Sequence, residues 1–167
     1  MKSPIEIRDV TPEDMGAILS LNEEFVHFLS PLCEAELARL GGKADYFRVA
    51  VIDERVVGFL LAFVPGVNYN SLNYRWFNNR FDDFAYIDRI VVASDAQGRA
   101  LGAKLYDDLV AFAATRGLSQ LTCEYNIMPM NEGSAKFHKR YGFTEIGQQA
   151  LSDNEKRVSL QSYRLPR

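Results

Sequence analysis

The stretch RIVVASDAQGRALGAKLYDDL, residues 89–109, decides how the chain folds. Apolar residues up to Val92 predict the end of a strand, and leucines at helical spacing from Leu101 predict a helix. Gly98 and Gly102 lie at this junction, where they remove side chains that would keep a ligand away from the backbone. Unpaired N–H groups and the helix dipole both favour an anion at such a point. The junction is therefore either an anion-binding loop or a plain tight turn.

The rest of the chain alternates strand-like and helix-like patterns, which predicts a mixed α/β fold in a single domain over residues 1–167. Strands are expected over 5–8, 46–52, 56–64, 84–93, 118–127, 143–149 and 157–164. Helices are expected over 12–29, 31–40, 101–116 and 132–141. Gly41 and Gly42 are expected to end the second helix, and a polar loop at 152–155 is expected to join the last two strands.

Residues 66–84 predict a long loop that carries large aromatic side chains. Tyr69, Tyr74, Trp76 and Phe77 occur there among five asparagines. Two interpretations stay open for these rings: they close one end of the core, or they line a pocket. Loops of this length are often functional.

Composition excludes several classes of protein. The net charge of −3 argues against a nucleic-acid binder, and no apolar run is long enough to cross a membrane. The N-terminus lacks the apolar stretch of a signal peptide, and two distant cysteines favour a reducing cytoplasm. Only two histidines occur, without an HExxH pattern, so no metal site is expected.

The residues at the junction fit neither of two familiar phosphate-binding designs. A nucleotide P-loop needs GxxxxGK, but only three residues separate Gly98 from Gly102, and Ala103 follows. The dinucleotide pattern GxGxxG fails because Ala100 stands where its second glycine is required. What remains is a run of backbone amides at a helix N-terminus, with Arg99 as an added cation.

Three motifs in order resemble the GCN5-related N-acetyltransferase (GNAT) superfamily. QGRALG, residues 97–102, resembles its Q/R-x-x-G-x-G/A acetyl-CoA signature, with Ala100 at the first motif glycine, a replacement that the loop tolerates if this residue keeps a negative φ. YIDRIVV, residues 86–92, resembles the strand that leads into this loop, and NEGSAKFHKRYGF, residues 131–143, resembles the second signature. The resemblance covers almost the whole chain. It implies a central mixed, mostly antiparallel sheet flanked by helices, with a parallel strand pair that splays apart.

The resemblance implies acetyl-CoA as co-substrate, bound between strands 84–93 and 118–127. The backbone of Ile90 and Val92 would pair with the pantetheine amides. The diphosphate would be held by Gln97, Gly98, Arg99, Ala100, Leu101, Gly102 and Ala103. Asn131, Ser134 and Phe137 would contact the cofactor from the following helix. A helix cap is the other interpretation of Asn131, and core packing is the other interpretation of Phe137.

Acetyl transfer to an amine needs a proton acceptor, a donor to the oxyanion and a proton source for the leaving thiolate. The resemblance implies a backbone amide near Val91 or Val92 as the oxyanion donor. It implies His138 as the proton source, at a position where many members carry tyrosine. A histidine that is merely packed is the alternative.

Two carboxylates are candidates for the proton acceptor. Tyr86 stands where some family members carry glutamate, and Asp88 lies two residues on, on the same face of the strand. Asp88 is the first candidate because it sits in YIDRIVV, beside the expected thioester. Glu124, on the partner strand, is the second. For each carboxylate, an ion pair with Arg89 or a surface cation is the alternative.

The function these residues predict is acetyl transfer from acetyl-CoA to a primary amine by direct attack in a ternary complex. No cysteine is placed as a nucleophile, since Cys123 fits a buried strand position. The alternatives are an acyl-CoA-binding module with little turnover and a protein N-terminal acetyltransferase. Residues 66–84 and the first two helices are expected to shape the acceptor pocket. Homodimers are common in the family, so the resemblance allows one.

Overall fold

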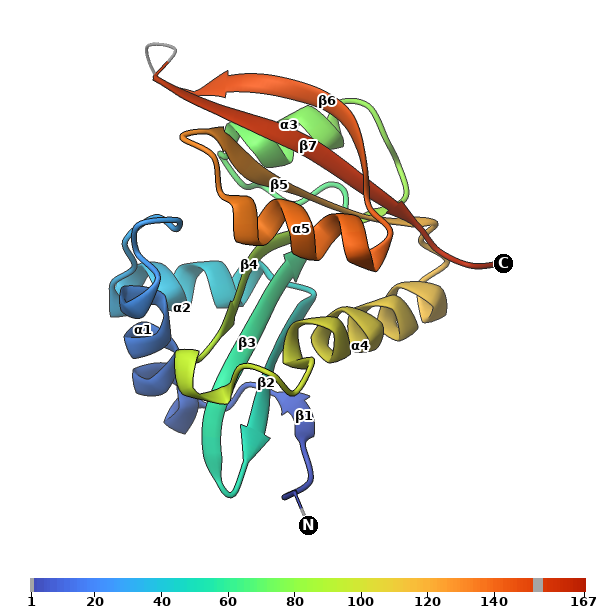
Figure 1. The fold of residues 1–167 in the computed structure, drawn as a ribbon. Coiled ribbons are helices and arrows are strands. Elements are labelled where there is room, and N and C mark those ends of the chain that lie inside the picture. Colours follow the sequence, from blue (N-terminus) through green and yellow to red (C-terminus); the bar gives the residue numbers. More distant parts are fainter. Residues whose placement is uncertain (1, 152–154) are drawn as a thin grey trace. The chain divides into compact units, whose positions relative to one another are not determined.

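A computed structural model describes residues 2–151 and 155–167, so the predicted loop at 152–155 lies outside the described residues except for Glu155. Seven strands form one mixed sheet in the order β1-β2-β3-β4-β5-β7-β6, with five α-helices flanking it (Figure 1). The strands are β1 (Glu6–Asp9), β2 (Tyr46–Ile52), β3 (Arg55–Phe63), β4 (Phe84–Val92), β5 (Gln120–Met128), β6 (Thr144–Leu151) and β7 (Lys156–Arg164). The helices are α1 (Met15–Glu24), α2 (Glu34–Lys43), α3 (Leu72–Asn78), α4 (Leu101–Thr115) and α5 (Glu132–Tyr141), with short 3-10 turns η1 (Pro12–Asp14) and η2 (Ser94–Ala96). The predicted fold class is confirmed.

The parallel strand pair is also confirmed. β4 runs parallel to β5 in a register that pairs Phe84 with Gln120 and Tyr86 with Thr122. The other registered pairs, β1 with β2, β2 with β3, β5 with β7 and β6 with β7, are antiparallel. The sheet is therefore mostly antiparallel, as expected.

Two predicted helix ends were wrong. The first helix ends at Glu24 and does not reach residue 29, because Phe25 leaves helical geometry and the buried Asn22 side chain donates to the carbonyl oxygen of Ser30 at 3.0 Å. This bond holds the following segment in turns. The second helix continues through both glycines to Lys43, and the Ala44 N–H still reaches the Leu40 oxygen at 3.1 Å. Glycine lowers helix propensity but does not forbid the helix.

The predicted loop at 66–84 contains a helix, α3, that the sequence did not predict. Ser71 begins it by accepting a hydrogen bond from the Tyr74 N–H at 3.3 Å. Tyr74 and Phe77 are buried, so for these two rings the core interpretation is confirmed. Asparagine and aromatic residues have modest helix propensity, and here the burial of one aromatic face outweighs it.

The contacts divide the chain into two compact units. Unit 1 comprises the described residues of Met1–Phe63 and Asp88–Phe112, and unit 2 those of Val64–Ile87 and Ala113–Arg167. In unit 1, Tyr46 of β2 donates to Asp108 of α4 at 2.6 Å, whereas a Cβ on Gly41 of α2 would lie 3.2 Å from the Phe47 ring. Adjacent strand residues point to opposite faces, so α4 and α2 cover opposite faces of β2.

In unit 2, α3 and α5 cover opposite faces of β5 (Figure 1). The Glu124 side chain accepts a hydrogen bond from Tyr86, whose ring lies 5.5 Å from that of Tyr74 on α3. The next residue, Tyr125, lies 5.7 Å from the ring of His138 on α5. The alternation of a strand therefore separates Glu124 and His138 onto different faces.

One glycine in unit 1 permits the close approach of β3 to β4. A Cβ on Gly58 would lie 2.8 Å from the carbonyl oxygen of Val91. Because that atom is backbone, it cannot move aside as a side chain could. We expect Gly58→Ala to lower the free energy of unfolding by about 1–3 kcal/mol, measured by urea denaturation.

Gly42→Ala is the matched control, since a Cβ there meets no atom within 4 Å and the residue lies inside α2. It should stabilise the protein slightly, through higher helix propensity. Equal stability of Gly58→Ala and the wild type would show that the two strands have room for a side chain.

Candidate functional site

The predicted anion-binding loop lies in unit 1 as a strand, a loop and a helix in direct succession. β4 ends at Val92, η2 follows, and α4 begins at Leu101. The first donor of α4 is the Lys104 N–H, which reaches the Ala100 oxygen at 3.0 Å. The amides of Leu101, Gly102 and Ala103 precede it, so they belong to the first turn, whose N–H groups have no partner within a helix. Gln97 and Gly98 are exposed, and a Cβ on Gly98 would meet nothing within 4 Å.

The backbone at Ala100 does not meet the condition under which alanine is tolerated without strain at the first motif glycine. Its φ is +57°, and Gly98 has a φ of +90°, so two left-handed residues turn the chain into α4. The turn needs at Ala100 a conformation that glycine adopts more readily than alanine. An L-residue in this region costs about 1–2 kcal/mol.

The Arg99 side chain is tied to the N-terminal segment. Its Nη2 donates to the carbonyl oxygen of Ser3 at 2.6 Å, and the side chain is half-buried. The guanidinium therefore adds positive charge to the loop from a fixed position. Direct contacts between this loop and a diphosphate stay a prediction.

The C-terminal half of β4 combines half-buried and buried positions. Val91 is buried, whereas Ile90 and Val92, the predicted pantetheine partners, are half-buried. This alternation follows the period of a strand. The following residue, Ala93, donates its N–H to the Val57 oxygen of β3 at 2.8 Å, which fixes the point where the strand ends.

Asp88 lies beside a buried cation. The Arg89 Nε donates to Asp88 at 3.3 Å, and the two side chains are 9% and 7% exposed. The Nη1 of Arg89 also donates to the Asn22 side chain at 2.9 Å and to the Ser30 oxygen at 2.7 Å. The ion pair that the sequence left open for Asp88 is therefore present. Arg89 also fixes the chain that follows α1.

Tyr86 and Glu124 form a direct pair in unit 2. The Tyr86 hydroxyl donates to a Glu124 carboxylate oxygen. Tyr86 is buried by the rings of α3, while Glu124 is half-buried. A carboxylate that accepts a hydrogen bond from a phenol can take up a proton, and the phenol can pass one on.

The second motif forms α5, and Asn131 caps it. The Asn131 side chain accepts a hydrogen bond from the Ser134 N–H at 3.2 Å, which confirms the helix-cap interpretation. Phe137 is half-buried, with its ring 5.1 Å from that of His138 and 6.5 Å from that of Tyr141. Its packing inside the cluster supports a core role, and contact with a cofactor stays a prediction.

His138 is buried in an aromatic cluster. Its Nδ1 lies 2.8 Å from the Ser134 carbonyl oxygen and 3.1 Å from the Ser134 hydroxyl. The rings of Phe143 and Tyr125 lie 5.0 Å and 5.7 Å away. Burial lowers the pKa of His138 below its usual 6.5, and the bond to Ser134 opposes this in part. Burial therefore favours the neutral imidazole, and the packed alternative fits these contacts.

Sequence reasoning missed several polar partners. Glu24 accepts hydrogen bonds from Ser94, and Arg55 pairs with Asp95, immediately before the loop. On the α5 face of the sheet, Gln161 donates to the Tyr125 hydroxyl at 3.3 Å. These pairs are far apart in the sequence, so no local pattern indicates them.

None of the helices among residues 2–151 and 155–167 has the length and apolar character that a membrane span requires.

Comparison with known proteins agrees with this architecture. The model of the acetyltransferase (GNAT) family matches residues 16–143, and the chain belongs to this family. No curated protein matches the sequence.

Solved structures share the fold at low identity. Ard1 from Thermoplasma volcanium is 15% identical, with a TM-score of 0.79 over 98% of this chain and 99% of that one. The ribosomal-protein-S18-alanine N-acetyltransferase from Escherichia coli is 17% identical, with a TM-score of 0.73 over 97% and 94%. Arabidopsis thaliana NAA60, in complex with a bisubstrate analogue, is 14% identical, with a TM-score of 0.75 over 96% and 98%. At this identity the likeness concerns the fold alone.

The backbone at Ala100 gives a direct test of the loop geometry. We expect Ala100→Gly to raise the free energy of unfolding by up to about 1 kcal/mol, because glycine removes the left-handed strain but adds chain entropy to the unfolded state. Ala103→Gly, three residues on in α4, should lower it by about 0.5–1 kcal/mol. Urea denaturation of both variants tests whether the free energy of unfolding rises in Ala100→Gly and falls in Ala103→Gly. A loss of stability in Ala100→Gly would contradict a left-handed conformation at residue 100.

The burial of His138 predicts its titration. Because burial disfavours the charged ring, its NMR resonances should titrate below pH 6.5. A depressed pKa means that this histidine contributes stability above pH 6.5, and the contribution is lost as the pH falls through the folded-state value. Titration at or above 6.5 would mean that the ring is solvated or paired with an acid.

Proposed function

We propose that residues 1–167 form one acetyl-CoA-dependent N-acetyltransferase domain that transfers an acetyl group to a primary amine. The observation that carries the proposal is the open loop before α4 in a member of the GNAT family, whose model covers residues of both units. Family members use acetyl-CoA, and a structural neighbour, Arabidopsis thaliana Naa50, is bound to a CoA bisubstrate analogue (14% identity, TM-score 0.71, 95% of this chain and 97% of that one).

The cofactor assignments divide between the two units. In unit 1, the amides of residues 97–103 bind the diphosphate, and the backbone of Ile90 and Val92 pairs with pantetheine. In unit 2, Asn131, Ser134 and Phe137 contact the cofactor from α5. Successive amides at a helix start hold an anion without a metal ion or a flexible side chain. This makes the loop suited to a diphosphate.

For the chemistry, we assign Glu124 as the proton acceptor and Tyr86 as its partner. Asp88 is a weaker candidate, because its carboxylate is already paired with the buried Arg89 guanidinium. The amine attacks the thioester carbon, and an amide of Val91 or Val92 donates to the oxyanion. The C–S bond then breaks. The amine proton passes to Glu124, and the thiolate takes a proton from Tyr86, which regains one from Glu124.

His138 has a different role in this proposal from the one first predicted. Its ring lies on the α5 face of β5, whereas Glu124 lies on the α3 face. The proposal therefore includes no direct proton transfer between them. We propose that His138 packs and orients α5, and that direct donation from this ring to the thiolate is the alternative to test.

Specific observations favour two alternatives, a binding module and a protein N-terminal acetyltransferase. The strained Ala100 in the loop favours a binding module with little turnover. The name of the ribosomal-protein-S18-alanine N-acetyltransferase and the peptide part of the CoA-Ac-MVNAL analogue bound to Naa50 support a protein N-terminus as one acceptor class to test. The free cysteines, Cys33 and Cys123, support a reducing compartment such as the cytoplasm.

Calorimetry with CoA and thiol release from acetyl-CoA test the proposal together. The wild-type chain should bind CoA, and thiol release should rise when an amine panel, including peptides with free N-termini, is added. CoA binding without any amine-dependent release would favour the binding module. The absence of CoA binding would overturn the proposal.

The assignment of the proton acceptor needs variants. Glu124→Gln should lower kcat by about 10²-fold or more, with the Kd for CoA unchanged, because general-base catalysis contributes that much. Tyr86→Phe should lower kcat as well. Glu132→Gln, an exposed residue of α5, is the control and should leave the rate unchanged. If His138→Asn lowers kcat as strongly as Glu124→Gln while CoA binding and stability hold, the histidine is the proton source.

A further inference from the structure

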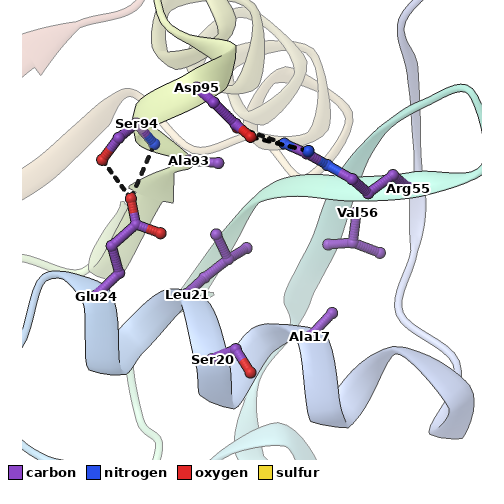
Figure 2. A pocket seen from close by; sticks show the side chains of 9 residues that line it. All are labelled: Ala17, Ser20, Leu21, Glu24, Arg55, Val56, Ala93, Ser94 and Asp95. Atoms are coloured by element: carbon purple, nitrogen blue, oxygen red, sulfur yellow. Dashed lines mark hydrogen bonds and ion pairs between the residues drawn. The ribbon is translucent and has the colours of Figure 1, made fainter.

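Two side chains from other elements hold the segment that leads into the loop before α4. Glu24, near the end of α1, accepts hydrogen bonds from the Ser94 N–H at 2.9 Å and from the Ser94 hydroxyl. Figure 2 shows this carboxylate below the turn that carries Ser94. A carboxylate that accepts both a backbone and a side-chain donor fixes the direction in which the chain leaves β4.

Arg55, at the start of β3, holds the next residue. Its guanidinium bonds both carboxylate oxygens of Asp95, with Nη1 to Oδ2 at 2.9 Å, in a bidentate pair (Figure 2). Bidentate geometry restrains orientation as well as distance. Glu24 and Arg55 thus tie two consecutive residues of η2 to two different elements of unit 1.

An open surface pocket lies beside this segment (Figure 2). It has a volume of about 430 Å³, and its walls include Ala17 and Leu21 of α1, Val56 of β3 and Ala93. Glu24 and Arg55 also line it, so these two side chains, the tethers of the turn, lie where the turn borders the pocket.

We propose that Glu24 and Arg55 are positioning residues for the diphosphate loop. The inference rests on the proposed function. Ser94 and Asp95 are followed within two residues by Gln97, so the tethers fix the start of the run of amides, while the bond from Arg99 to Ser3 fixes its middle. If a tether is lost, the loop spends part of its time in other conformations, and the apparent Kd rises as the inverse of the fraction that remains competent to bind.

The test compares CoA with pantetheine, which lacks the diphosphate. Glu24→Ala and Arg55→Gln should each weaken CoA binding about threefold to tenfold by calorimetry, and the double variant should weaken it further. Pantetheine binding, followed by NMR titration, should not change. A merely structural role would weaken both ligands.

The controls distinguish the loss of these two tethers from the loss of an ion pair elsewhere in unit 1. Arg39 pairs with Glu36 on α2 in the same unit, so Arg39→Gln removes a comparable ion pair away from the loop and should not affect either ligand. The exchanged pair Arg55→Asp with Asp95→Arg should restore CoA affinity lost in Arg55→Asp alone.

The outcomes distinguish this inference from the function itself. CoA affinity unchanged in the double variant, or an equal loss for CoA and pantetheine with a lower melting temperature, would overturn the positioning role. A wild-type chain that does not bind CoA would overturn the proposed function, and with it the reason for a positioned loop.

Discussion

The structure depends on how the chain turns from β4 into α4. The first amides of α4 can serve an anion only if they are neither covered by side chains nor closed by the preceding backbone. Two residues with positive φ, Gly98 and Ala100, make that turn, and the small residues Gly102 and Ala103 keep its first helical turn accessible. The turn is strained at Ala100 and is held by bonds from α1, β3 and the N-terminal segment. Its shape is thus a property of unit 1 as a whole.

The second organising feature is that successive side chains of β5 point to opposite faces of the sheet. Glu124 meets Tyr86 on the face that α3 covers, and Tyr125 meets His138 on the face that α5 covers. The aromatic cluster around His138 favours a neutral ring, while the half-buried Glu124 keeps contact with solvent and with a phenol. Under the proposed function, the α5 face of this strand serves structural support and the α3 face serves acid–base chemistry.

The sequence predicts the junction at residues 89–109 well, because strand hydrophobicity, turn residues and helical spacing all occur within one short window. It does not predict α3, where asparagines and aromatics have weak helix propensity and burial decides. It names Tyr86, Asp88, Glu124 and His138 as candidates and ranks Asp88 first among the carboxylates, without access to their partners. Contacts such as Tyr86 with Glu124, 38 residues apart, and Glu24 with Ser94, 70 residues apart, follow from no local pattern. Such contacts exist only once the sheet has formed.

Because side chains alternate along β5, the strand tolerates substitutions better than changes in its length. Inserting or deleting one residue ahead of Glu124 would rotate every later side chain of the strand to the opposite face. The carboxylate would then enter the aromatic cluster, and the phenol of Tyr86 would face another partner. Length within this strand is therefore under tighter constraint than the identity of most of its residues, and natural variation in spacing should accumulate in the connections outside it.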